Sequence, residues 1–150
     1  MELMNPRERR YLENRLKKQH GVENAFGDLL LIKAGQGRIR AATREVFEAA
    51  RRLRKVQQLG LYVAKISRGD VFLSIEGSQL LNGEITKNVI ELDEEAANEW
   101  MKASPITAQM RYDSRYVVAK TGDLYLGSGR VTRDGKIYPQ IAKWRRIPAD

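Results

Sequence analysis

Four short turns that contain glycine constrain the fold of this chain more than any other feature. They lie at residues 35–37, 68–70, 121–123 and 133–135, and each separates two segments of strand-like composition. Turns this short join antiparallel neighbours, because a parallel connection needs a crossover of about a dozen residues or more. No apolar run approaches the roughly 18 residues of a membrane-spanning helix. We therefore expect β-hairpins and no membrane span.

The N-terminal residues 5–20 are predicted to form a helix. Asn5 suits the N-cap, Pro6 suits the first helical position, and Glu8 can close a capping box. The apolar stripe of this segment is thin, so we expect the helix at the periphery of the molecule. The single histidine of the chain, His20, ends the helix, and we expect its side chain to be exposed.

A second helix is predicted over residues 44–58, with Thr43 as its N-cap. The residues expected on its buried face are Val46, Ala49, Ala50, Leu53 and Val56. A basic stripe on the opposite face consists of Arg44, Arg51 and Lys55. The simpler interpretation of this stripe is a solvated helix face, and the functional one is a secondary contact for the phosphates of RNA.

The other predicted elements complete a pattern in which hairpins alternate with helices. Strands are predicted at residues 29–33, 38–42, 61–67, 71–75, 89–92, 116–120, 124–131 and 137–147, a short helical turn at 76–81, and a third helix at 93–102. This order predicts an α+β fold. A boundary near residues 83–88 divides the chain into two expected domains, 1–86 and 87–150.

The charge of the chain favours polyanionic partners. The 27 Lys and Arg outnumber the 19 Asp and Glu, which gives a net charge of +8. Residues 1–60 carry +7 and residues 111–150 carry +5, whereas residues 61–110 carry −4. Such a balance suits nucleic acid or an acidic membrane surface. The alternative is an ion-rich surface that serves stability.

The sequence lacks the residues that several kinds of catalytic and metal site require. Cysteine is absent, which excludes disulfides, Cys-zinc sites and a cysteine nucleophile. A histidine-based metal site or a catalytic triad would need partners for His20 that this chain lacks. The Gly35–Gly37 pair lacks the remainder of either glycine-rich phosphate motif. We therefore expect no catalytic residue, no metal and no cofactor. The charged N-terminus is unlike a signal peptide, so we expect a cytoplasmic protein.

A resemblance to a known family lies in the later residues. Residues 116–131, YVVAKTGDLYLGSGRV, resemble the central hairpin of PUA domains, which are small RNA-binding pseudo-barrels. Together with residues 134–146, they are similar to the PUA-like C-terminal module of Sun-family RNA cytosine-5 methyltransferases, in which an LGxG hairpin leads to a basic tail. Residues 41–46, 59–65 and 72–81 are similar to the small domain that precedes this module.

This resemblance implies a small N-terminal α/β (pre-PUA) part, followed by a PUA-like β pseudo-barrel. It implies a protein that binds structured rRNA or tRNA in ribosome biogenesis or RNA modification. Because the cysteine nucleophile of the family is absent, we expect a non-catalytic adaptor for an RNA-modifying enzyme on another chain. Two alternatives remain: a DNA-binding regulator that inserts helix 44–58 into the major groove, and a small enzyme with an unrecognised site.

The predicted RNA-binding residues lie near the C-terminus. Five cations are expected on two adjacent strands: Arg130, Lys136, Lys143, Arg145 and Arg146. Beside them, Gly127 and Gly129 either let the RNA approach the backbone or make room for helix 93–102.

Alternation in a strand over 137–147 would place Lys143 and Arg145 on one face and Trp144 and Arg146 on the other. We expect Trp144 in the core, which is the commoner place for a strand tryptophan. The alternative is a platform on which an unpaired base stacks.

Overall fold

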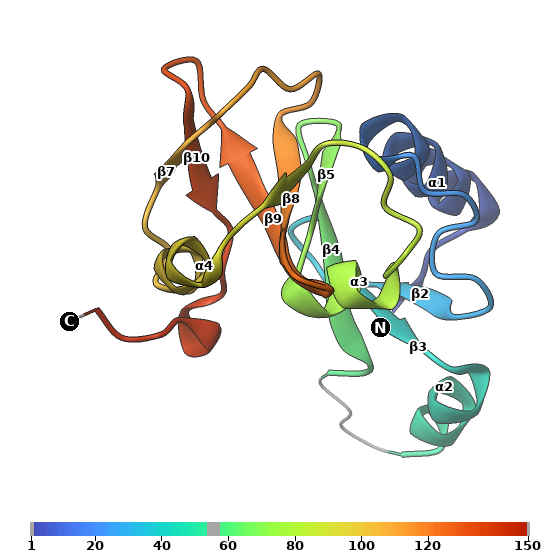
Figure 1. Ribbon diagram of the computed structural model, residues 1–150. Coiled ribbons are helices and arrows are strands. Elements are labelled where there is room, and N and C mark those ends of the chain that lie inside the picture. Colours follow the sequence, from blue (N-terminus) through green and yellow to red (C-terminus); the bar gives the residue numbers. More distant parts are fainter. Residues whose placement is uncertain (1, 54–57, 150) are drawn as a thin grey trace.

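The computed structural model describes residues 2–53 and 58–149, which form an α+β fold with two five-stranded sheets (Figure 1). The first sheet has the order β1-β2-β3-β4-β5, and all its neighbours are antiparallel. Its strands are β1 (Glu2–Leu3), β2 (Leu30–Lys33), β3 (Arg38–Ala42), β4 (Leu61–Ser67) and β5 (Asp70–Leu73). Three helices accompany it: α1 (Pro6–His20), α2 (Arg44–Arg51) and α3 (Ile75–Leu80).

The second sheet is curled and has the order β6-β8-β9-β10-β7 (Figure 1). Its strands are β6 (Val89–Glu91), β7 (Ile106–Thr107), β8 (Tyr116–Thr121), β9 (Leu124–Val131) and β10 (Lys136–Pro139). β6 runs parallel to β8, and the chain between them contains helix α4 (Glu94–Met101). The other pairs are antiparallel, so the predicted hairpin of residues 116–131 is confirmed.

The local signals at the helix starts are confirmed. At α1, the backbone N–H of Glu8 donates to Asn5 Oδ1 at 2.8 Å, and the backbone N–H of Asn5 donates to Glu8 Oε1 at 3.0 Å. Thr43 and Asp93 accept from the third residue of α2 and α4 in the same manner. Each cap satisfies an N–H group that has no partner within its helix.

Helix α1 lies on the outside of the molecule, as predicted, and covers one face of the first sheet with its thin apolar stripe (Figure 1). Leu12 and Leu16 are fully buried and pack in a core with Val63, Val71 and other sheet residues. A stripe of two leucines is enough because the sheet supplies the remaining apolar surface. The end of α1 is also fixed to the sheet edge, since the side chain of Gln19 donates to Val71 O and accepts from Val71 N, each at 2.8 Å.

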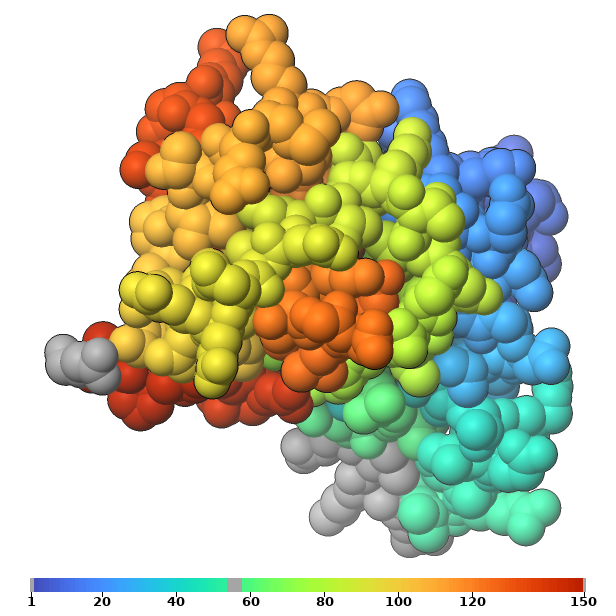
Figure 2. Space-filling model, in the orientation of Figure 1, coloured from blue at the N-terminus to red at the C-terminus, as the bar shows by residue number. Residues whose placement is uncertain are grey.

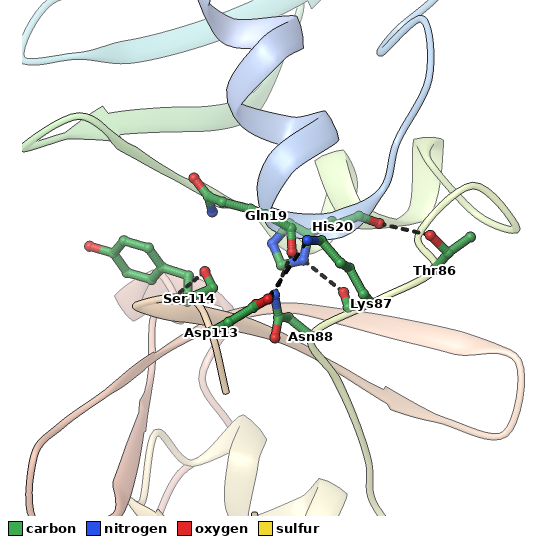
Figure 3. Close-up of polar contacts among 8 residues, drawn as sticks. Gln19, His20, Thr86, Lys87, Asn88, Asp113 and Ser114 are labelled. Carbon is green, nitrogen blue, oxygen red and sulfur yellow. Dashed lines mark hydrogen bonds and ion pairs between the residues drawn. The ribbon is translucent and has the colours of Figure 1, made fainter. Parts of the chain in front are cut away.

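His20 lies at the junction between α1 and the segment that leads to the second sheet (Figure 3). Its side chain is 0% exposed, so the prediction of an exposed histidine is wrong. Nδ1 lies 3.1 Å from the carbonyl oxygen of Lys87, to which it must donate, because a carbonyl only accepts. Nε2 is buried and has no hydrogen-bond partner among the residues that the structure describes. Charging the ring would therefore place an unsatisfied cation in the interior.

Asn88 connects the same junction to the loop before β8 (Figure 3). Its side-chain amide donates to Gln19 O at 2.6 Å and to Asp113 Oδ1 at 2.7 Å. Its backbone adopts a φ of 56°, which asparagine tolerates better than most residues. The end of α1, the connecting segment and the 113 loop are thus held together by polar contacts around His20.

Helix α2 packs differently from the prediction. Ala50 is buried and Phe47 is half-buried against Ile32 and Ala42, but Val46 and Leu53 are 47% and 66% exposed. Ala49 is exposed as well, so the expected buried face is wrong for Val46, Ala49 and Leu53, because the helix meets only the β2–β3 end of the sheet. Residues 54–57 of the predicted helix, which include Val56, lie outside the described residues.

The core of the second sheet is built around Trp100 of α4. This side chain is fully buried, and its Nε1 donates to the carbonyl oxygen of Leu126 at 3.0 Å. It packs with residues of β8, β9 and β10, among which are Val117, Leu126 and Ile137. The apolar residues predicted on helix 93–102 therefore form a buried layer over the sheet.

The two sheets meet at β5. The backbone N–H of Leu73 donates to Ser128 Oγ at 2.8 Å, and Val118 and Tyr125 of the second sheet belong to the core cluster of the first. The proposed division near residue 86 thus crosses a continuous interior. Within the described residues, no helix combines the length and the apolar character needed to cross a membrane.

Candidate nucleic-acid interface

The C-terminal segment leaves the second sheet earlier than predicted. Strand β10 ends at Pro139, which lies opposite Gly129, and the expected strand 137–147 is wrong beyond that point. One further backbone bond joins Gln140 N to Ser128 O, after which Ile141 turns into the core and is 3% exposed. Residues Lys143–Arg145 then form a 3-10 helix. The predicted alternation of faces over 143–146 therefore does not apply.

Trp144 lies on the surface, where its side chain is 79% exposed, so the prediction of a core tryptophan is wrong. The interior position that a tryptophan could occupy is taken by Trp100, and Ile141 is the residue of the tail that turns inward. Around the indole, Lys143, Arg145 and Arg146 are all exposed. The indole ring of Trp144 is therefore exposed with cations beside it, which is the alternative to a core position.

Three contacts fix this C-terminal segment to the body of the protein. Arg145 Nη1 pairs with Glu76 Oε1 of α3 at 2.5 Å, Ile147 N donates to Met101 O of α4 at 2.9 Å, and Arg146 Nε donates to Ile141 O at 3.0 Å. Figure 2 shows the segment, in red, lying along the surface beside α4, in yellow. The backbone below Trp144 is therefore held in place.

The two glycines of the LGxG hairpin are buried by packing, which contradicts the hypothesis that a ligand approaches them. A Cβ atom on Gly129 would collide with the ring of Trp100 and lie 2.7 Å from Ile137 Cγ2. A Cβ atom on Gly127 would lie 3.1 Å from the backbone N of Ile75, and the φ of Gly127 is +81°. These glycines let α4 and α3 approach the sheet closely.

Arg130 and Lys136 lie on the strands, as predicted, and their side chains are exposed. Arg130 lies opposite Tyr138 in the β9–β10 ladder, and its guanidinium carbon is 5.6 Å from the centre of the Tyr138 ring. Lys136 precedes Tyr138 by two residues, so both side chains point to the same face. The five predicted cations therefore divide between this sheet face and the C-terminal segment.

A row of aromatic and cationic side chains extends from Tyr138 onto the first sheet, and it was not predicted from the sequence. Tyr116 lies opposite Arg130, the rings of Tyr116 and Phe72 are 5.3 Å apart, and Lys65 Nζ is 5.8 Å from the Phe72 ring. We call this set the aromatic row, and its members are Lys65, Phe72, Tyr116, Arg130, Tyr138 and Lys136. The only sequence signal was alternation within single strands, since the order of the row depends on which strands are neighbours.

The phenol of Tyr116 stays neutral at ordinary pH. Burial raises its pKa above the usual value, and the positive charge of Arg130 opposes that rise only in part. The aromatic row therefore combines uncharged rings with the cations Lys65, Arg130 and Lys136.

The basic stripe on α2 is partly described by the structure. Arg44 and Arg51 are exposed, and Arg51 Nη1 lies 3.5 Å from Glu48 Oε2. Lys55 lies outside the described residues. The two described arginines are therefore accessible, which suits both interpretations of the stripe.

Within residues 2–53 and 58–149, no group of three or more histidine or acidic side chains is arranged to hold a metal ion. Comparison with protein-family models and with curated proteins gives no match.

Proposed function

We propose that the protein binds folded RNA, such as rRNA or tRNA, through its C-terminal segment. The observation that carries this proposal is the exposed Trp144, surrounded by Lys143, Arg145 and Arg146 on an anchored turn. Unpaired bases of folded RNA stack on exposed aromatic rings, and Lys and Arg bind the neighbouring phosphates. An exposed indole ring gains little free energy from contact with water. A ligand with a flat apolar face would therefore explain why this ring lies on the surface.

The resemblance to PUA domains supports the same proposal. We propose that the second sheet with α4 is a PUA-like pseudo-barrel and that residues 1–86 form the part that precedes it. In this proposal the protein is a non-catalytic adaptor in ribosome biogenesis or RNA modification, and an enzyme on another chain performs the chemistry. The absence of cysteine agrees with this role, because the related methyltransferases depend on a cysteine nucleophile.

Removal of the Trp144 ring should weaken RNA binding without unfolding the protein. We expect Trp144→Ala to lower the affinity for a folded RNA by roughly tenfold, because base–aromatic stacking contributes about 1–3 kcal/mol per base. Trp144→Phe should retain most of the affinity, because it keeps an aromatic face. The melting temperature should change little, since the side chain is 79% exposed. Fluorescence anisotropy with labelled tRNA, beside thermal melting, measures both quantities.

The matched control removes cations from α1. Arg7 and Arg10 are exposed, whereas Arg9 donates to Leu29 O and Gly27 O and must be kept. The double variant Arg7→Gln with Arg10→Gln should affect binding less than Trp144→Ala. Equal binding by Trp144→Ala and the wild type would contradict the proposal. Tighter binding to duplex DNA than to tRNA at the same salt concentration would favour the DNA-binding alternative.

Charge reversal on α2 tests the secondary contact. We expect Arg44→Glu with Arg51→Glu to lower the affinity for folded RNA by about threefold, because each arginine can neutralise one phosphate at most. Folding should be retained, since both side chains are exposed. Anisotropy titrations at two salt concentrations provide the measurement. An unchanged affinity would assign the stripe to a solvated helix face.

A further inference from the structure

We infer that the aromatic row binds an unpaired RNA strand, at a surface separate from the C-terminal segment. This inference rests on the proposed function, since RNA is the ligand in both. The row crosses from β4 and β5 of the first sheet to β8, β9 and β10 of the second. Its two accessible rings are Phe72, which is half-buried, and Tyr138, which is 37% exposed.

Helices α1, α2 and α4 do not cover this surface, and α3 packs against β4 beside Val63, two residues before Lys65. Helix α1 packs on the opposite face of the first sheet, beside Val71. Helix α2 covers only the end of the sheet where Ile32 and Ala42 lie. On the second sheet, α4 packs with Val117 and Ile137, whose side chains alternate with Tyr116 and Tyr138 and so face the other side. The aromatic row is therefore accessible at its two ends, at Phe72 on the first sheet and at Tyr138 on the second. Tyr116 between them is 7% exposed, so it supports the Phe72 ring and does not itself offer a surface to a ligand.

The combination of rings and cations in the aromatic row determines which kind of ligand it can bind. Each accessible ring has a cation over it: Lys65 Nζ is 5.8 Å from the Phe72 ring, and the guanidinium carbon of Arg130 is 5.6 Å from the Tyr138 ring. A single strand offers unpaired bases to the rings and phosphates to the cations, and its bases can also stack on the flat guanidinium. A duplex keeps its bases stacked inside, and an acidic peptide would leave the rings unused. Of these three ligands, the unpaired strand is therefore the one that can use both the aromatic rings and the cations.

The test uses a fluorescein-labelled short oligouridylate, which forms no secondary structure, and the full-length protein. Tyr138→Leu keeps the strand and its apolar character but removes the ring, and we expect it to lower the affinity for the oligouridylate roughly tenfold (about 1.4 kcal/mol at 25 °C). Tyr138→Phe should bind within about twofold of the wild type, because a base stacks on either ring. Circular dichroism melts verify that both variants fold.

A second pair of variants separates charge from stacking. Arg130→Gln with Lys136→Gln should flatten the dependence of log affinity on log salt concentration by about 1.4, which is about 0.7 for each phosphate contact to a single strand. The exposed pair Arg7 and Arg10 on α1 is the matched control, and its glutamine variants should keep the slope within about 0.5 of the wild type. Inorganic polyphosphate, which has charge but no bases, should compete weakly.

The outcomes distinguish the two proposals. If the wild type binds neither tRNA nor the oligouridylate, the proposed function fails and the inference fails with it. If tRNA binds through Trp144 but Tyr138→Leu binds the oligouridylate as the wild type does, the inference alone is overturned. If polyphosphate competes fully and Tyr138→Leu has no effect, the surface binds acidic ligands in general, and the inference is again overturned.

Discussion

Acidification from pH 6.5 to 4.5 is expected to lower the free energy of unfolding by about 2 kcal/mol through His20 alone. Burial lowers the pKa of His20 from 6.5 to about 4, and the hydrogen bond to Lys87 O opposes this shift only in part. The unfolded chain therefore gains a proton near pH 6.5 that the folded protein does not accept until about pH 4. Stability is fully present above pH 6.5, falls through this window, and is reduced by about 3 kcal/mol below pH 4.

The comparison variant is His20→Asn, whose amide can still donate near the position of Nδ1 but does not titrate. Urea unfolding at pH 7.0, 5.5 and 4.5 gives the pH dependence of stability in both proteins. Glu8, Asp113 and Asp134 have lowered pKa values in the folded state, so their contribution to stability is lost as pH falls through their unfolded values of 4.5, 3.8 and 3.8, mainly below the measured window. The small part of the Glu8 contribution that is lost near pH 4.5 is common to both proteins, so the difference between them reports on His20. His20→Asn should lose most of the pH dependence above 4.5, whatever its stability at pH 7. An identical pH dependence in the two proteins would contradict the burial of His20.

The elements that the sequence predicted well are those fixed by local chemistry. The capping box of Asn5 and Glu8, the N-cap Thr43 and the turn 121–123 each involve residues a few positions apart. Such signals do not depend on the remainder of the fold, so a single sequence is sufficient to identify them. The α+β class followed from the same local signals.

The predictions that failed were those decided by distant contacts. His20 is buried because residues 86–88 and Asp113 close over the end of α1, and nothing in residues 5–20 indicates this. Trp144 is exposed because Ile141 enters the core and the following turn is tied to Glu76. Burial of either side chain depends on which other segments arrive at the same place.

The candidate site depends even more on contacts between residues that are distant in the sequence. Arg130 and Lys136 could be named from the sequence because they lie in adjacent strands of predicted hairpins. The contact between Phe72 and Tyr116 joins two sheets, and no local pattern contains it. A surface assembled across sheets is therefore found only once the strand order and register are known.

The glycine of the LGxG hairpin nearest the C-terminus provides the second large effect. Gly129→Ala is expected to lower the free energy of unfolding by about 3 kcal/mol, at the upper end of overpacking costs. The added Cβ would collide with the Trp100 ring and lie 2.7 Å from Ile137 Cγ2. Trp100 cannot withdraw, because it is fully buried and its Nε1 is bonded to Leu126 O at 3.0 Å. Urea unfolding measures the loss, and Tm should fall with it.

Gly135→Ala separates this packing effect from backbone strain. Gly135 has a φ of +82°, and a Cβ added there would meet no described atom within 4 Å, so its substitution should cost only about 1 kcal/mol. The tRNA affinity of Gly129→Ala, measured at a temperature where the variant is fully folded, should stay within about twofold of the wild type. A stable Gly129→Ala protein with a large loss of RNA affinity would reverse the conclusion, because it would mean that the ligand, and not Trp100, requires the missing side chain.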